Sequence, residues 1–230
     1  MFVRRFFSVW FYFLLVVFIS NSYSDELCEP ENAIKNLRVI DNYTLKANCS
    51  FLSGYPSKSA SGAVNVVIEI PTGTNEKWEV NKPEGELKWG IRDGKPRVIN
   101  YLGYPGNYGM VPQTLLSKER GGDGDPLDVI VLGPAAPRGS VVEVKVIGVL
   151  KLMDQGEQDD KLIAVSKGSD FYGVKNLDML NDKFIGASKI LELWFANYKG
   201  VGKMQVLGFG DEKDAAKILD AAIFEYEKNK

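Results

Sequence analysis

The most restrictive feature of this 230-residue sequence is its complete lack of histidine. Without an imidazole, Ser-His-Asp triads, Cys-His dyads, imidazole zinc sites and imidazole general bases are all excluded. An excess of positive charge is also missing, since 28 Lys and Arg residues stand against 30 Asp and Glu residues. This balance argues against a protein that binds nucleic acid through bulk charge. Any catalysis must therefore use carboxylates, Lys, Arg, Tyr, Ser or Cys.

Cysteine is scarce, and the two cysteines, Cys28 and Cys49, follow a segment that is typical of a cleaved secretory signal. Residues 1–24 combine Arg4 and Arg5, a long apolar run and small residues at the end. An uncleaved membrane anchor is the alternative, although the run is short for a span of about 20 residues. We expect a periplasmic or extracellular protein without stable membrane insertion after cleavage, or a cytoplasmic one if the segment is wrongly assigned as a signal.

An oxidising compartment lets a disulfide persist, so we expect Cys28 and Cys49 to pair. Two unrelated thiols are the alternative, because the sequence alone does not show that their Cβ atoms approach each other.

The rest of the chain divides into an N-terminal extension, residues 25–62, and a single domain, residues 63–230. The polar composition of the extension predicts that it packs outside the core. In the domain we expect strands at residues 63–70, 77–80, 97–102, 128–132, 141–152 and 161–165, the first two as a hairpin. Their close spacing indicates a small antiparallel barrel, mainly β, with flanking C-terminal helices at residues 187–199 and 212–228, the second capped by Asp211.

One acidic cluster places Asp123, Asp125 and Asp128 immediately before an apolar strand. Like charges this close repel one another unless cations neutralise them, and hard divalent ions such as magnesium prefer these oxygen ligands. A solvated acidic turn is the alternative.

A second acidic cluster contains Asp154 and Asp159 and ends at Lys161, between two expected strands. Alone it is typical of a solvent-facing hairpin loop. Together with the first cluster and with Lys77, Arg97 and Lys199, it would complement a phosphate or diphosphate held through metal ions. Tyr108 and Tyr198 offer hydroxyl donors to phosphate, although each tyrosine alone is more often a core residue.

These elements, in this order, resemble the family I soluble inorganic pyrophosphatases, the magnesium-dependent enzymes that hydrolyse diphosphate to two phosphates. The D-x-D-P-x-D element stands at residues 123–128 and the D-x4-D-x-K element at residues 154–161. The segments VVIEIP and KWEV supply Glu69, Lys77 and Glu79, GNYG supplies Tyr108, and NYK supplies Tyr198 and Lys199.

The resemblance implies an OB-like five-stranded β-barrel with the active site at one opening. It implies magnesium ligands at Asp123, Asp128, Asp154 and Asp159, with Glu69 contributing through water, and Asp125 as the general base. It implies phosphate-binding roles for Lys77, Arg97, Tyr108, Lys161, Tyr198 and Lys199, with Arg97 chosen over Arg92. Manganese would satisfy the same oxygens. Two metals lower the pKa of a shared water, so a carboxylate suffices as proton acceptor.

The leading hypothesis is therefore magnesium-dependent hydrolysis of inorganic diphosphate by a protein that forms a homo-oligomer, as its relatives do. A metal-dependent phosphatase for organic phosphates shares the same residues and is the first alternative. A non-catalytic OB-like binding module is the second. No nucleic acid partner is expected, because a nucleic-acid groove should be basic and aromatic whereas the clustered groups here are carboxylates.

Overall fold

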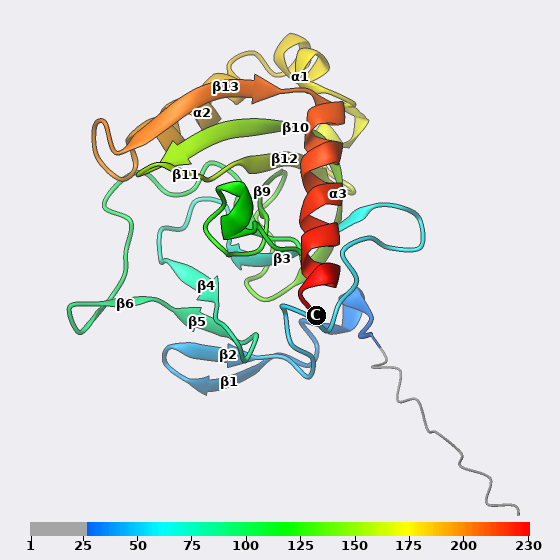
Figure 1. The fold of residues 1–230 in the computed structure, drawn as a ribbon, viewed down its shortest axis with the longest axis vertical. Helices are drawn as coiled ribbons and strands as arrows, with labels where there is room; N and C mark the ends of the chain where they lie inside the picture. Colours follow the sequence, from blue (N-terminus) through cyan, green and yellow to red (C-terminus); the bar gives the residue numbers. More distant parts are fainter. Residues whose placement is uncertain (1–26) are drawn as a thin grey trace, which may run out of the picture.

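The computed structural model describes residues 27–230, so the expected signal at residues 1–24 lies outside the described residues. Its main sheet closes into a ring of five strands, because β10 pairs with both β12 and β3 (Figure 1). The ring contains β3 (Val64–Ile70), β8 (Asn107–Met110), β9 (Asp128–Leu132), β12 (Lys161–Ser166) and β10 (Val141–Asp154). The mainly β fold is confirmed, with one correction: β9 and β12 run parallel, whereas every other pair in the ring is antiparallel.

Within residues 27–230, three α-helices follow the last ring strand in the sequence. They are α1 (Leu177–Lys183), α2 (Ala187–Asn197) and α3 (Glu212–Lys228). The predicted cap of α3 is confirmed, since the Asp211 side chain accepts hydrogen bonds from the backbone N–H groups of Lys213 and Asp214 at 3.0 and 2.8 Å. Neither α1 nor β13 (Met204–Gly210) was predicted from the sequence, and β13 pairs with β10 outside the ring. The short elements of this half are η2 (Lys118–Arg120), β11 (Glu157–Gln158) and η3 (Asp170–Gly173).

The ring strands bury side chains on both faces. Ile163 belongs to a cluster that includes Trp194 and Phe195 of α2, whereas its neighbour Leu162 belongs to a cluster that includes Leu219 of α3. Successive side chains of a strand point to opposite faces of the sheet. Helix α2 therefore covers one face of the ring strands and α3 covers the other. This double burial explains why the parallel strands β9 and β12 are nearly continuous apolar runs rather than alternating ones.

The N-terminal extension forms a second sheet with two later strands, at the end of the molecule away from α1 (Figure 1). The extension contributes the short helix η1 (Pro30–Asn32) and the strands β1 (Arg38–Asp41) and β2 (Thr44–Lys46). The two later strands are β4 (Trp78–Val80) and β5 (Leu87–Trp89), and the strand order in the sheet is β1-β2-β5-β4. We call this sheet together with residues 28–55 the N-terminal layer.

The N-terminal layer shares a hydrophobic core with the ring, which corrects the expectation that residues 25–62 pack outside the core. Phe51 and Tyr55 are buried and belong to a cluster with Val67 of the ring and Trp78 of β4. The expected disulfide is present, with the Cα atoms of Cys28 and Cys49 6.4 Å apart.

Two expected strand assignments are wrong. Segment 77–80 does not pair with β3, because β8 and β10 already occupy both edges of β3, so β4 pairs with β5 instead. Segment 97–102 contains only one isolated bridge, between Val98 and Glu76. It follows the small hairpin of β6 (Ile91–Arg92) and β7 (Lys95–Pro96).

Within residues 27–230, none of the helices has both the length and the apolar composition needed to cross a bilayer.

Candidate active site

The candidate site is a cleft of about 1250 Å³ at the end of the ring where β9 and β12 begin and β10 ends. The parallel pairing of β9 with β12 brings these strand ends together, since their first residues, Asp128 and Lys161, are direct partners in the sheet. All the site residues predicted from the sequence line the cleft: Glu69, Lys77, Arg97, Tyr108, Asp123, Asp125, Asp128, Asp154, Asp159, Lys161, Tyr198 and Lys199.

Lys161 is the most deeply buried charge of the cleft, with 1% of its surface exposed. Its Nζ lies 2.5 Å from Oδ2 of Asp128 and also contacts Oδ1 of Asp159. Burial lowers the pKa of Lys161, but the two carboxylates outweigh burial and hold the pKa above its usual value. Burial also raises the pKa of Asp159. The floor of the cleft is thus a lysine that bridges two strand-end carboxylates.

The remaining aspartates surround this floor, with Asp154 at the end of β10 and Asp123 and Asp125 on the loop before β9. Asp154 pairs with Lys199, while its second oxygen, Oδ1, is buried and has no hydrogen-bond partner among the described residues. Asp125 pairs with Lys82 at the mouth, where 56% of the Asp125 side chain is exposed. The carboxylate of Asp123 accepts a hydrogen bond from the backbone N–H of Asp125 at 2.8 Å, and burial raises the pKa of Asp123.

The opposite side of the cleft comes from β3, β4 and the segment that follows β7. Glu69 of β3 is buried, and its Oε1 accepts a hydrogen bond from the backbone N–H of Val80 at 2.7 Å. Burial raises the pKa of Glu69 to about 8, against the opposing effect of Lys77. Glu79 lies 3.3 Å from Nζ of Lys77 and 3.0 Å from Nη1 of Arg97, so it holds both cations on this side.

Two tyrosines line the cleft between these walls. The Tyr108 ring, on β8, lies 4.9 Å from Nζ of Lys77 and 5.9 Å from Nζ of Lys161. The Tyr198 ring, after α2, stacks on Trp194 at 4.6 Å between ring centroids. Burial raises the pKa of both phenols. Both hydroxyls therefore stay protonated at neutral pH and can donate hydrogen bonds.

The donor set of the cleft fits a hard divalent cation. In the described part of the chain no three acidic or cysteine side chains form a ready-made metal site, and lysines pair with Asp128, Asp159 and Asp154. The available ligands are nevertheless carboxylate oxygens, which magnesium prefers. The buried Oδ1 of Asp154 has an unmet need for a donor or cation. The residues therefore fit magnesium or manganese.

Comparisons with known proteins agree with this geometry. The family model described as inorganic pyrophosphatase matches residues 66–227. The chain belongs to the inorganic pyrophosphatase family. The inorganic pyrophosphatase of Gluconobacter oxydans is 34% identical over 172 residues, which cover 73% of this chain and 94% of the relative. That of Sulfolobus acidocaldarius is 35% identical over 173 residues, with the same shares covered. The solved structure of inorganic pyrophosphatase from Schistosoma japonicum is similar with a TM-score of 0.75 at 28% identity, covering 80% of this chain and 75% of that one.

Family membership confirms the resemblance drawn from the motifs, and the structure adds residues that the motifs did not assign. Lys82 was missed because its partner, Asp125, is distant in the sequence, so no local spacing connects them. Arg92 and Lys203 also line the cleft. Arg97 is half-buried and paired with Glu79, whereas Arg92 is exposed on β6, so the geometry places the preferred arginine deeper in the cleft.

Proposed function

We propose that this protein hydrolyses inorganic diphosphate to two phosphates with the help of magnesium ions. The observation that carries the proposal is the convergence in one cleft of five aspartates with Lys77, Arg97, Lys161 and Lys199 in a member of the inorganic pyrophosphatase family. Carboxylates that hold metal ions, combined with fixed cations, complement a substrate whose negative charges are packed closely together.

The chain's own residues support distinct roles in this reaction. Asp123, Asp128, Asp154 and Asp159 would hold magnesium, with Glu69 acting through water. When bound, magnesium supplies positive charge and lowers the pKa of water. Asp125, half-exposed at the mouth, would accept the proton of the attacking water.

The remaining predicted residues would bind the phosphates. Lys77, Arg97, Lys161 and Lys199 bring fixed positive charge to oxygens on which charge develops in the transition state. Tyr108 and Tyr198 would donate hydrogen bonds from hydroxyls that burial keeps protonated. This division uses every predicted site residue in the cleft.

The first experiment measures phosphate release from diphosphate, ATP and p-nitrophenyl phosphate by residues 25–230, with magnesium, with manganese and with a chelator. Metal-dependent release confined to diphosphate is the expected result. Comparable rates on the organic phosphates would favour the alternative of a general metal-dependent phosphatase. A folded sample that releases phosphate from none of them would overturn the proposal and favour a binding module.

The role of Asp125 is tested by Asp125→Asn, which keeps the size of the side chain and removes its basicity. We expect the rate to fall by about 100-fold or more, the range for losing a general base. Asp220→Asn is the matched control, because Asp220 is also an exposed aspartate in a lysine pair, 2.7 Å from Nζ of Lys58, on α3 outside the cleft. A rate within threefold of the parent would reject Asp125 as the base.

We also propose that the protein is exported and forms a homo-oligomer. The Cys28–Cys49 disulfide supports export, because disulfides persist in oxidising compartments. Expression of the full sequence, followed by fractionation and N-terminal sequencing, should find a chain that begins near residue 25 outside the cytoplasm. Sedimentation velocity on that chain should give a mass of at least two copies, and a monomer at micromolar concentration would contradict the oligomer.

A further inference from the structure

The C-terminal helix α3 carries a buried acidic residue that the proposed reaction does not use. The buried positions of α3 are Ala215, Leu219, Ala222 and Glu225, which recur at the spacing of one helix face. Glu225 therefore occupies a place in the apolar stripe, with only 2% of its surface exposed. Burying an unpaired charge in such a position costs free energy of folding. Glu225 therefore needs a charged partner, and its presence on an apolar helix face needs an explanation.

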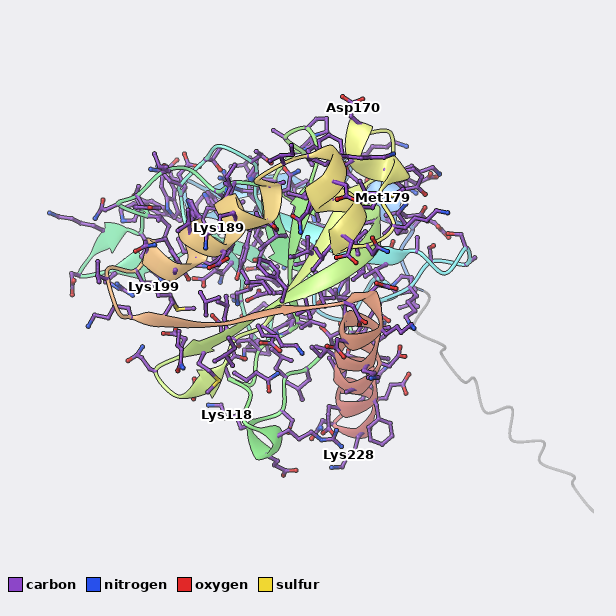
Figure 2. The ribbon with its side chains drawn as sticks, turned by 90° about the horizontal axis from the view of Figure 1, so that it is seen from above. Lys118, Asp170, Met179, Lys189, Lys199 and Lys228 are labelled. Atoms are coloured by element: carbon purple, nitrogen blue, oxygen red, sulfur yellow. A yellow bond between two sulfur atoms is a disulfide. The ribbon has the colours of Figure 1, made fainter. Side chains whose placement is uncertain are left out.

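The partner of Glu225 is Arg120, in η2 on the segment that leads to the acidic cluster. Nη2 of Arg120 lies 2.9 Å from Oε1 of Glu225, and the arginine side chain is 60% exposed. The geometry is that of an ion pair rather than of a linear hydrogen bond. Figure 2 shows η2, where Lys118 is labelled, beside the C-terminal end of α3, where Lys228 is labelled.

Two further contacts tie the same segment to α3. The backbone N–H of Leu115 donates to the carbonyl of Ala222 at 3.0 Å, one helical turn before Glu225. Nζ of Lys228 lies 3.9 Å from a carboxylate oxygen of Glu119. Segment 115–120 is thus held at its start and at its tip by one helix.

The segment returns from this tip directly into the site. The backbone N–H of Leu116 donates to the carbonyl of Asp125 at 2.8 Å and closes the loop at its base. Asp125 therefore lies at the base of the loop, and Asp123 lies between the base and the tip. At the tip, the backbone N–H of Gln158 donates to the carbonyl of Gly121 at 2.9 Å, which connects this loop to the loop that carries Asp154 and Asp159. A displacement of the tip would therefore move both acidic loops.

We propose that Arg120 and Glu225 are positioning residues that anchor the acidic loops to α3 and so set the metal affinity of the cleft. The inference rests on the proposed function for the roles of the aspartates. Replacing a buried ion pair by well-packed apolar residues often leaves stability unchanged or raises it. Here only Glu225 is buried, and Arg120, whose side chain is 60% exposed, stays in contact with water when its partner is replaced. Stability alone therefore gives no reason for a charged residue at position 225, whereas fixing the position of a loop does.

The decisive variant is Glu225→Met, which completes the apolar stripe of α3 and removes the anchor. We expect the unfolding midpoint to stay equal or rise, while Mn²⁺ binding in the absence of diphosphate weakens about tenfold, as for lost outer partners of metal ligands. Hydrogen exchange of segment 115–126, followed by mass spectrometry on the metal-free protein, should become at least severalfold faster. Glu225→Gln gives the same readouts, with smaller changes, if the methionine variant folds poorly.

The matched control is Asp214→Asn on the same helix. Asp214 also forms a cross-element ion pair, with its Oδ2 2.9 Å from Nζ of Lys151 on β10, but it does not contact the acidic loops. The control should leave both Mn²⁺ affinity and exchange of segment 115–126 unchanged. Arg120→Gln added to Glu225→Met should weaken Mn²⁺ binding by less than a further twofold, because the two residues act as one unit.

Unchanged Mn²⁺ affinity and unchanged exchange in Glu225→Met would overturn the anchor, as would an equal effect of Asp214→Asn. The exchange measurement needs neither metal nor substrate. If the parent released no phosphate from diphosphate, faster exchange in Glu225→Met would still support the anchor while the proposed function failed.

Discussion

The cleft and the N-terminal layer bury side chains of opposite character. The cleft buries Lys161 and Glu69, whose charges must be matched by neighbours, whereas the layer buries the aromatic residues Phe51 and Tyr55. Removing aromatic surface from water stabilises the fold, but removing charges from water costs free energy that ion pairs recover only in part. The contrast indicates that apolar regions such as the layer stabilise the fold while the cleft is specialised for chemistry.

One strand joins the two regions. In β4, Trp78 packs into the core of the layer and stacks on Trp89 at 5.6 Å between ring centroids. Its sequence neighbours Lys77 and Glu79 line the cleft. Alternation of side chains along an extended strand produces this division. The layer therefore holds the back of the strand whose front carries two charges of the site.

The largest effect on stability is expected from Phe51→Ala, which tests the apolar side of the comparison. Phe51 is fully buried and stacks on Tyr55 at 5.9 Å between ring centroids, so its truncation should cost about 4 kcal/mol of unfolding free energy. At urea concentrations below its lowered unfolding midpoint, the folded variant should keep kcat and KM for diphosphate within about threefold of the parent. Urea titration and steady-state kinetics check both parts, and a large loss of kcat in the folded variant would contradict the separation of roles.

Lys161→Met tests the charged side and should cost somewhat less. The substitution leaves Asp128 and Asp159 close together without their shared cation, and breaking a buried ion pair costs about 3 kcal/mol. Activity should fall far more than in Phe51→Ala, because this lysine also lies at the floor of the cleft.

Magnesium sharpens the same experiment. A divalent cation can take over the neutralisation of the two carboxylates, so the metal should raise the unfolding midpoint of Lys161→Met more than that of the parent. The matched control, Lys145→Met, makes the same replacement outside the cleft and should show no extra effect of the metal on the unfolding midpoint. Equal metal-induced shifts of the unfolding midpoint in the parent and in Lys161→Met would contradict the expectation that Asp128 and Asp159 bind a cation once Lys161 is replaced.

Local pattern was sufficient for some elements and failed for others for identifiable reasons. The apolar runs at 128–132 and 161–165 and the helix at 212–228 were predicted closely, because their signals are continuous and, for the helix, begin with a cap. No strand was predicted at residues 107–110, but pairing with β3 and β9 makes this segment β8. The strand β13 contains Gly208 and Gly210, which weaken its β pattern, and among the described strands it pairs with β10 alone.

The site was easier to predict than the fold around it. The motifs and the family resemblance that they carry selected residues from β3 to the end of α2, and all of them line one cleft. The pairs that cross between distant segments, Lys82 with Asp125 and Arg120 with Glu225, could not be predicted, because neither partner carries a local signal. Sequence patterns therefore selected residues that share one cleft, but not the ion pairs that connect distant segments around that cleft.

The smallest effect on stability is expected at Glu86, which forms an ion pair with Lys46 of the N-terminal layer. Its Oε1 accepts a hydrogen bond from Nζ of Lys46 at 2.8 Å, which links β2 to the turn before β5. This bond lowers the pKa of Glu86. Because Lys46 is half-exposed, Glu86→Gln should cost at most about 1 kcal/mol at pH 7.

A lowered pKa in the folded state means that the stabilisation by Glu86 is present above its unfolded pKa of about 4.3 and is lost as the pH falls through the folded value. Urea midpoints of parent and Glu86→Gln should therefore differ at pH 7 and converge in strong acid. Lys46→Met should behave in the same way, because it removes the other partner of the same bond. A difference that grew on acidification would show that the carboxylate of Glu86 is not the stabilising form, and that the layer depends on apolar burial alone.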